Sequence, residues 1–170
     1  MQNTPDISLI IPLLNEEESL LPLHKWILDV FNKDSRTYEV IFIDDGSSDN
    51  SWNIISKLTK KHLNVFGIKF FKNYGKSQAL HAGFAIAKGN HIVTLDADLQ
   101  DSPEEIPRLV DALSNQKLDL ISGWKKKRYD SILFKNIPSK LFNWAARKVS
   151  GIDLHDFNCG LKAYTKEVIK

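Results

Sequence analysis

The chain has 170 residues, of which 42% are hydrophobic and 26% charged, and its formal net charge is +2. These values fit one ordinary globular domain, and they exclude a disordered chain, a collagen and a coiled coil. The single cysteine, Cys159, excludes an internal disulfide framework and a cysteine-only zinc site. We therefore expect one domain that occupies residues 1–170.

Apolar runs and helical patterns alternate along the chain. The expected strands are residues 7–11, ended by Pro12, and then residues 39–43, 65–70, 91–95 and 119–123. The expected helices are residues 19–31, 48 or 49 to 61, 77–87, 103–114 and 139–149, and another begins after residue 165. This alternation predicts βαβ units. The expected fold class is therefore α/β, with a Rossmann-like, predominantly parallel sheet and helices on both faces.

Positive charge is concentrated late in the sequence. Residues 117–148, called the basic stretch below, hold 9 Lys and Arg but only 2 Asp and Glu. Such a stretch is either a solvated face or a surface for an anionic partner, for example a phosphate or a membrane. No apolar run approaches the roughly 20 residues that cross a bilayer. The sequence stops just as a helix is expected to begin, so we expect a truncated chain.

Polar residues follow four of the expected strands, and ligands bind at the carboxyl ends of strands in such sheets. Asp96 and Asp98 follow the fourth strand and are separated by one residue, so their side chains point the same way. Two converging carboxylates repel each other unless a cation joins them, and oxygen ligands suit Mg²⁺ or Mn²⁺. The alternative is a turn with two solvated aspartates.

The loops after the second and third strands add weaker signals. Asp44 ends the second strand, where a carboxylate can accept hydrogen bonds from a ribose or a base, and residues 46–48 open a helix whose N-terminus favours anions. Lys72 and Lys76 flank a turn that can bring their ammonium groups near a diphosphate. Taken alone, these residues are better explained as a tight turn and two surface lysines.

Two common nucleotide-binding patterns are missing from the sequence. There is no Gly-x-Gly-x-x-Gly after the first strand and no Gly-x-x-x-x-Gly-Lys-Ser/Thr. The chain is therefore neither a dinucleotide-binding domain of the usual type nor a P-loop NTPase. The five histidines show no metal-ligand spacing, and we interpret them as structural.

Four motifs occur in one order: Pro-x-x-Asn-Glu at 12–16, Asp-Asp-Gly-Ser at 44–47, Lys-Asn-x-Gly-Lys at 72–76, and Asp-Ala-Asp-Leu-Gln-Asp at 96–101. In this combination the chain resembles the family 2 glycosyltransferases of GT-A fold. It is most similar to the branch with dolichyl-phosphate mannose synthase and the bacterial polyprenyl-phosphate glycosyltransferases. The resemblance implies a metal-dependent, inverting transfer of a sugar from a nucleotide-diphosphate donor to a polyprenyl phosphate, undecaprenyl or dolichyl.

The resemblance also implies roles for individual residues. Asp96 and Asp98 would hold Mg²⁺ or Mn²⁺ together with the donor diphosphate. The residues implied to bind the nucleotide are Pro12, Asn15, Glu16, Asp44, Lys72, Lys76 and Asp96. The residues implied in catalysis are Asp96, Asp98, Gln100 and Asp156; Gln100 would face donor or acceptor, and Asp156 the acceptor side.

The acceptor is implied to meet the late, basic part of the chain. Lys125, Arg128, Arg147 and Lys162 would hold its phosphate, although Leu161-Lys162 replaces the Phe-Arg that the family carries. Apolar residues interleave with the cations of the basic stretch, as in an interfacial segment. We therefore expect contact with a membrane surface on its cytoplasmic face, membrane helices after the domain, no nucleic acid partner, and possible homo-oligomers.

Three other functions are compatible with parts of this pattern. A family 2 glycosyltransferase that acts on a saccharide hydroxyl of a polysaccharide would need a catalytic base to deprotonate its acceptor. A haloacid-dehalogenase-like phosphatase also carries Asp-x-Asp after a strand, but after the first strand of its fold and not the fourth. A nucleotide-binding module without activity would not release a nucleoside diphosphate.

Overall fold

The computed structural model describes residues 4–123 and 159–169, so the expected helix 139–149 and most of the basic stretch lie outside the described residues. Within those residues the strands form one sheet of order β3-β2-β1-β4-β6-β5. The strands are β1 Ile7–Leu13, β2 Tyr38–Asp44, β3 Val65–Lys69, β4 His91–Thr94, β5 Leu120–Ser122 and β6 Lys162–Thr165. The helices are α1 Leu20–Phe31, α2 Ser51–Lys61, α3 Lys76–Ile86, the 3-10 helix η1 Pro103–Glu105, α4 Ile106–Asn115 and α6 Lys166–Ile169.

Strands β1 to β4 pair in parallel, which confirms the expected α/β class and its predominantly parallel sheet. The departure is β6, which runs antiparallel between β4 and β5. Its four residues, Lys-Ala-Tyr-Thr, contain no apolar run, so the sequence did not predict a strand there. The antiparallel direction brings the start of β6 to the carboxyl end of β4, where Lys162 lies opposite Thr94.

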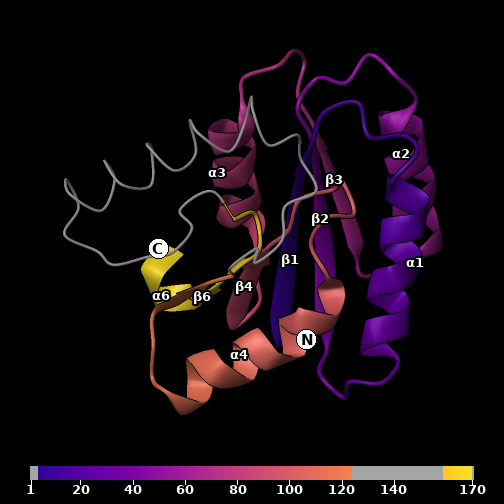
Figure 1. Cartoon of the computed structure of the whole chain (residues 1–170). Coiled ribbons are helices and arrows are strands. Elements are labelled where there is room, and N and C mark those ends of the chain that lie inside the picture. Colours follow the sequence, from indigo (N-terminus) through magenta and orange to yellow (C-terminus); the bar gives the residue numbers. More distant parts are fainter. Residues whose placement is uncertain (1–3, 124–158, 170) are drawn as a thin grey trace, which may run out of the picture.

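Helices cover both faces of the sheet, as expected, with α1 and α2 on one side and α3 on the other (Figure 1). Alternate residues of a strand point to opposite faces. Leu9 and Ile11 of β1 accordingly belong to the core cluster that α1, α2 and α4 cover, while Ile10 belongs to the cluster under α3. All three side chains are fully buried, which explains why β1 is a continuous apolar run in the sequence. Among the described helices, none combines the length and apolarity that crossing a membrane requires.

Proline 12 does not end the first strand, so that expectation was wrong. Strand β1 continues to Leu13, and Pro12 lies opposite Ile43 of β2. The pairing of β1 with β4 stops at Ile10, whose carbonyl oxygen accepts a hydrogen bond from the amide of Leu95. Side-chain and backbone directions alternate along a strand, so Pro12, like Ile10, turns its nitrogen towards β4. The ladder has already ended there, and the missing N–H costs no hydrogen bond.

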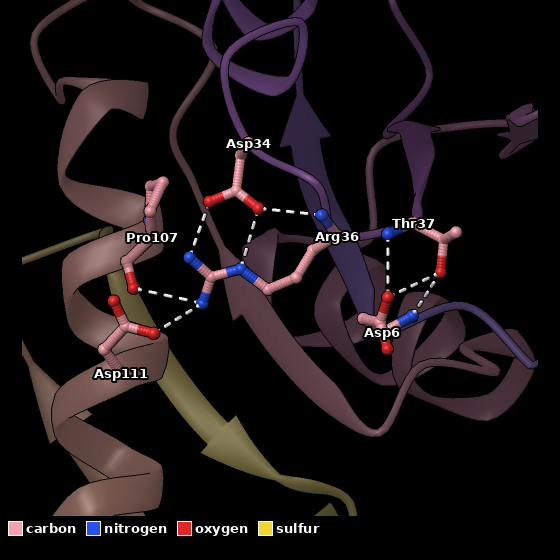
Figure 2. Close-up of polar contacts among 6 residues, drawn as sticks. All are labelled: Asp6, Asp34, Arg36, Thr37, Pro107 and Asp111. Atoms are coloured by element: carbon pink, nitrogen blue, oxygen red, sulfur yellow. Dashed lines mark hydrogen bonds and ion pairs between the residues drawn. The ribbon is translucent and has the colours of Figure 1, made fainter.

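Paired charges hold together the amino edge of the sheet (Figure 2). Arg36 precedes β2, and its guanidinium makes hydrogen bonds to both carboxylate oxygens of Asp34, to Asp111 of α4 at 2.8 Å and to the carbonyl oxygen of Pro107 at 3.3 Å. The hydrogen bonds from Arg36 lower the pKa of Asp34, and the same bonds raise the pKa of Arg36. This cluster fastens α4 to the loop that leads into β2.

A second amino-edge contact lies deeper in the molecule. The carboxylate of Glu39 is buried and accepts hydrogen bonds from the Ser8 hydroxyl at 2.5 Å and from the Lys88 amide at 2.7 Å. The Ser8 hydroxyl in turn accepts a hydrogen bond from the Gly89 amide at 2.8 Å. Each polar group of this buried contact is thus matched to one on β1, β2 or the α3–β4 turn, which is the condition under which a carboxylate can be buried.

Candidate active site

A pocket of about 340 Å³ opens at the carboxyl edge of the sheet, where the loops after β1, β2, β3 and β4 meet. In Figure 1 these loops lie at the upper ends of the strands. The residues that line it are Pro12, Leu13, Leu14, Glu16, Asp45, Asn73, Gly75, Lys76, Ala79, Asp96, Ala97 and Asp98. The structure thus brings together residues from all four sequence motifs.

The two aspartates after β4 both line this pocket, in different surroundings. Asp96 is partly buried, and its Oδ1 lies 2.5 Å from Nζ of Lys76, the first residue of α3. Asp98 is exposed, and its Oδ1 accepts a hydrogen bond from the amide of Gln100 at 3.1 Å across a turn in which Leu99 has φ of 61°. Gln100 itself is exposed and is not among the lining residues.

The backbone of Gly160 packs directly against the carboxylate of Asp96. A Cβ atom at position 160 would lie 2.3 Å from Cγ of Asp96, so only glycine fits there without a shift. The Thr94 hydroxyl donates a hydrogen bond of 2.7 Å to the carbonyl oxygen of Gly160, which fixes this approach. Sequence reasoning missed this residue, because the match to the family's Gly-Phe-Arg segment drew attention to the cation at Lys162 and not to the glycine.

The two adjacent aspartates after β2 separate into different environments. Asp44 is fully buried; its Oδ1 accepts a hydrogen bond from the Ser47 amide at 2.8 Å, and its Oδ2 has no hydrogen-bond partner among the described residues. Asp45 lines the pocket, and its carboxylate accepts hydrogen bonds from the amides of Tyr74 at 2.7 Å and Gly75 at 2.9 Å. The sequence analysis named Asp44 and missed Asp45, the neighbour that holds the loop before α3.

Hydrogen bonds join the loop after β1 to the loop after β2. Asn15 has φ of 56°; its amide donates to Ser47 Oγ at 2.9 Å and its Oδ1 accepts from the Ser48 amide at 2.9 Å. The amide of Glu16 donates to Ser51 Oγ at 2.9 Å. Glu16 lines the pocket, as does Pro12, whereas Asn15 lines a neighbouring hollow and shapes the loop.

The cations singled out in the sequence fall into three groups. Lys76 lines the pocket, whereas Lys72 is exposed outside it, with Nζ 5.4 Å from the centre of the Tyr74 ring. Lys162 is partly buried at the start of β6, beside the carboxyl end of β4. Three other cations, Lys125, Arg128 and Arg147, lie outside the described residues, and so does the acidic candidate Asp156.

The donor set of the pocket fits a hard divalent cation. Asp96 and Asp98 supply carboxylate oxygens from one loop, and the described residues contain no cluster of three or more His, Cys, Asp or Glu side chains that could enclose a metal. Mg²⁺ is commonly bound by one or two carboxylates, with waters and substrate phosphates as the other ligands. Two carboxylates in an open pocket are compatible with that kind of site.

A predominantly parallel α/β sheet with a carboxylate-lined pocket at its carboxyl edge has the pocket where open α/β sheets bind their ligands. Residues 8–170 match the family model described as Glycosyl transferase family 2, and the chain therefore belongs to this family. This confirms the resemblance seen in the motifs.

Curated relatives fall in the expected branch. The chain is 41% identical over 99% of its length to an undecaprenyl-phosphate 4-deoxy-4-formamido-L-arabinose transferase of Shewanella sediminis. It is 35% identical over 97% of its length to a dodecaprenyl-phosphate galacturonate synthase of Rhizobium johnstonii. These alignments cover 51% and 49% of the two relatives, so the chain spans about half their length.

Solved structures confirm the fold. Glucosyl-3-phosphoglycerate synthase from Mycobacterium tuberculosis, crystallised with Mn²⁺, UDP and phosphoglyceric acid, superposes with a TM-score of 0.73 at 20% identity, over 96% of this chain and 57% of that one. A mannosyltransferase from Pyrobaculum calidifontis in complex with GDP-Man and Mn²⁺ gives a TM-score of 0.65 at 20% identity, over 99% of this chain and 46% of that one.

Proposed function

We propose that this chain is the catalytic part of a glycosyltransferase that moves a sugar from a nucleotide-diphosphate donor to a polyprenyl phosphate. The observation that carries the proposal is the pocket at the carboxyl edge, in which Asp96, Asp98 and Lys76 come together from two loops. A diphosphate needs cations around it, and a divalent ion on the two aspartates together with the ammonium of Lys76 would supply them.

The donor nucleotide is proposed to lie across the loops after β1 and β2. Pro12 and Glu16 line the pocket there, and Asn15 holds the two loops together. The buried Asp44 has an oxygen for which the described residues offer no partner. Removing the carboxylate in Asp44→Ala is expected to raise the Kd for UDP or GDP more than the Kd for Mn²⁺, as measured by titration calorimetry. Unchanged nucleotide affinity would remove Asp44 from the donor site.

Asp96 and Asp98 are proposed to hold Mg²⁺ or Mn²⁺, which when bound would stabilise the negative charge that grows on the leaving diphosphate. Lys76 would add a positive charge to the same leaving group. Asp45 keeps the backbone of residues 74 and 75 in place for that contact, because its carboxylate accepts both of their amide hydrogens. The Gly160 backbone limits how far the Asp96 side chain can retreat towards β6.

The acceptor is proposed from chemistry and from the relatives. The two relatives named above differ in the sugar that their names carry but share a polyprenyl phosphate. A phosphate monoester has its second pKa at about 6, so it is already anionic near neutral pH and can attack without a strong base. Lys162, at the start of β6 beside Thr94, is proposed to attract this phosphate. The basic stretch would bring the chain to the cytoplasmic face of a membrane.

The deciding experiment is a panel of UDP- and GDP-sugars with undecaprenyl phosphate, with and without Mn²⁺, in which release of nucleoside diphosphate is measured. We expect release that requires both the lipid phosphate and the metal. A parallel series offers a saccharide with a free hydroxyl in place of the lipid phosphate. Turnover with the saccharide alone would overturn the acceptor assignment and favour the polysaccharide transferase.

A further inference from the structure

Lys76 forms an ion pair with Asp96, one of the two aspartates that would bind the metal. Its Nζ lies 2.5 Å from Oδ1 of Asp96, with the lysine side chain 52% exposed and the aspartate 24% exposed. Both residues line the pocket, although Lys76 begins α3 and Asp96 lies in the loop after β4. The positive charge next to Asp96 in this structure is therefore an ammonium group that the chain itself provides.

From this contact we infer that Lys76 makes metal binding depend on the donor. Before the donor arrives, the ammonium pairs with Asp96 and competes with a divalent cation for that carboxylate. When a nucleoside diphosphate enters, the ammonium moves to a phosphate oxygen, and Asp96 becomes available to the metal. This inference rests on the proposed function, because it assumes that the diphosphate lies in this pocket.

The charges around the pocket give the reason for this exchange. Among the described residues, four carboxylates line it, those of Glu16, Asp45, Asp96 and Asp98, against the single ammonium of Lys76. Two amide hydrogens already stabilise the Asp45 carboxylate, whereas Asp96 depends on Lys76. A diphosphate adds further negative charge, so it binds well only if cations accompany it. With both the lysine and the metal present, the metal can neutralise Asp96 while the lysine neutralises part of the charge of the diphosphate.

The move requires a change in one side chain only. Lysine is a flexible point charge with three rotatable donors, and partly exposed ion pairs are weak, so Nζ can exchange a carboxylate for a phosphate at small cost. The backbone before it can stay where it is, because Asp45 holds the amides of Tyr74 and Gly75. Asp96 cannot avoid the lysine by turning towards β6, because the Gly160 backbone fills that side.

The test is the Kd of the full chain for Mn²⁺, measured by titration calorimetry with and without saturating UDP or GDP, whichever binds. The ratio of the two Kd values measures the coupling between metal and nucleotide, which is reciprocal. In the wild type we expect the nucleotide to tighten Mn²⁺ binding. In Lys76→Met, Mn²⁺ without nucleotide should bind more tightly than in the wild type, and the ratio should fall about fivefold or more, the lower end of typical couplings.

Two further variants separate this inference from simple charge removal. Lys76→Arg keeps a cation that can make both contacts, and it should retain most of the coupling. Lys69→Met removes one positive charge from β3, the strand before α3, and it should leave the ratio of the two Kd values for Mn²⁺ unchanged. The Nζ of Lys69 lies 5.7 Å from the centre of the Trp52 ring. These controls show whether the effect belongs to position 76 or to net charge.

The results that overturn the inference are distinct from those that overturn the proposed function. A Lys76 that does not move would affect the Kd for Mn²⁺ equally with and without nucleotide. An unchanged ratio of these Kd values in Lys76→Met would therefore overturn the inference, whereas nucleotide binding by the same protein would leave the proposed function standing. Mn²⁺ binding to Lys76→Met that is no tighter without nucleotide would overturn it as well. Failure of the wild type to bind any nucleotide in the presence of Mn²⁺ would overturn the proposed function, and the inference with it.

Discussion

At the amino edge of the sheet, the carboxylate of Asp34 accepts hydrogen bonds from Arg36 of the same loop, and that of Glu39 accepts them from Ser8 and Lys88 of neighbouring elements. At the carboxyl edge, Asp44 keeps one buried oxygen without a partner among the described residues, and Asp96 is held by a half-exposed lysine. Both edges are built from the same kinds of residue. Among these four carboxylates, the two at the amino edge hold parts of the fold together, whereas Asp44 and Asp96 are less completely paired and are the ones that could meet a ligand.

The backbone shows the same tendency with one exception. Of the five described residues with positive φ, Asn15, Leu99, Gly46 and Gly75 lie in loops at the carboxyl edge, whereas Lys117, with φ of 52°, lies in the loop before β5 at the amino edge. Positive φ is uncommon outside glycine and costs conformational energy, so it is found where a loop must place its side chains in a particular way. At the carboxyl edge the chain accepts this cost for the shape of the pocket.

The strongest test of the comparison exchanges one carboxylate at each edge. Asp98→Asn is expected to lower turnover by about 10³-fold, since it removes a carboxylate proposed to hold the metal ion that would stabilise the leaving diphosphate. Its counterpart Asp34→Asn should keep turnover and lower stability, because within the described part of the chain the Asp34 carboxylate pairs with Arg36 at the edge opposite the pocket. Diphosphate release and urea unfolding of both variants check this. Near-normal turnover of Asp98→Asn in Mn²⁺ would end the assignment of a metal to the Asp-x-Asp pair.

The glycine beside Asp96 offers a steric test of the carboxyl edge. In Gly160→Ala the new methyl group would displace the Asp96 carboxylate, and a misplacement of about 1 Å at a reacting site can cost about 10²-fold in rate. Gly123→Ala is the matched control, because its Cβ would meet Leu161 and Cys159 but not Asp96. We expect turnover to fall in the first variant only; an equal loss in both would mean that the fold, and not the carboxylate, is disturbed.

His24 of α1 is a buried titratable group at neither edge of the sheet. It differs from the carboxylates in that burial keeps it uncharged. Burial, and then the positive charges of His62 and Lys61, lower the pKa of His24 to about 4. Between pH 6.5 and 4 the unfolded chain binds the extra proton, so stability should fall as the pH falls, by about 2–3 kcal/mol in all. Urea unfolding across this range should show a flatter profile in His24→Gln. Identical slopes would mean that His24 titrates alike in both states.

The smallest effect is expected from the amino-edge cluster. Arg36→Met breaks a partly buried network and should lower the free energy of unfolding by about 1–2 kcal/mol at pH 7, without changing turnover. Because the pKa of Asp34 is lowered in the folded state, this contribution exists above pH 4 and disappears as the pH falls below it. Arg108→Met, which removes an exposed ion pair with Glu105, should change stability by less than about 0.5 kcal/mol. A loss as large in Arg108→Met as in Arg36→Met would contradict this reading.

The sequence predicted the parts of the fold that depend on local hydrophobic pattern. Strands such as β1 and β2 are buried on both faces, so their residues form apolar runs that are visible without a structure. Strand β6 was not visible, because it is short and its place in the sheet is fixed by pairing with β4 and β5. Pro12 was expected to end the strand because proline has no N–H to donate. The sequence does not show that this position faces β4, whose pairing with β1 has already ended at Ile10.

The candidate site was predicted in outline, because strand ends are the usual positions of ligands in such sheets. The pocket contains Asp96, Asp98 and Lys76 as expected. Asp45 and Gly160 could not be predicted, because one acts through amides 29 and 30 residues away and the other through a close approach across β6. Contacts of this kind follow from tertiary packing and leave no local pattern.

The antiparallel position of β6 also has a consequence for how the protein is made. Strand β5 borders β6 and not β4 in the described sheet, so it has no neighbour until Lys162–Thr165 has left the ribosome. During synthesis the β3-β2-β1-β4 half can pair, while the hydrogen-bonding edge of β4 stays uncovered. An uncovered edge is a template for wrong pairing. The nascent chain is therefore most exposed to misassembly just before β6, the strand that covers this edge of β4, is available.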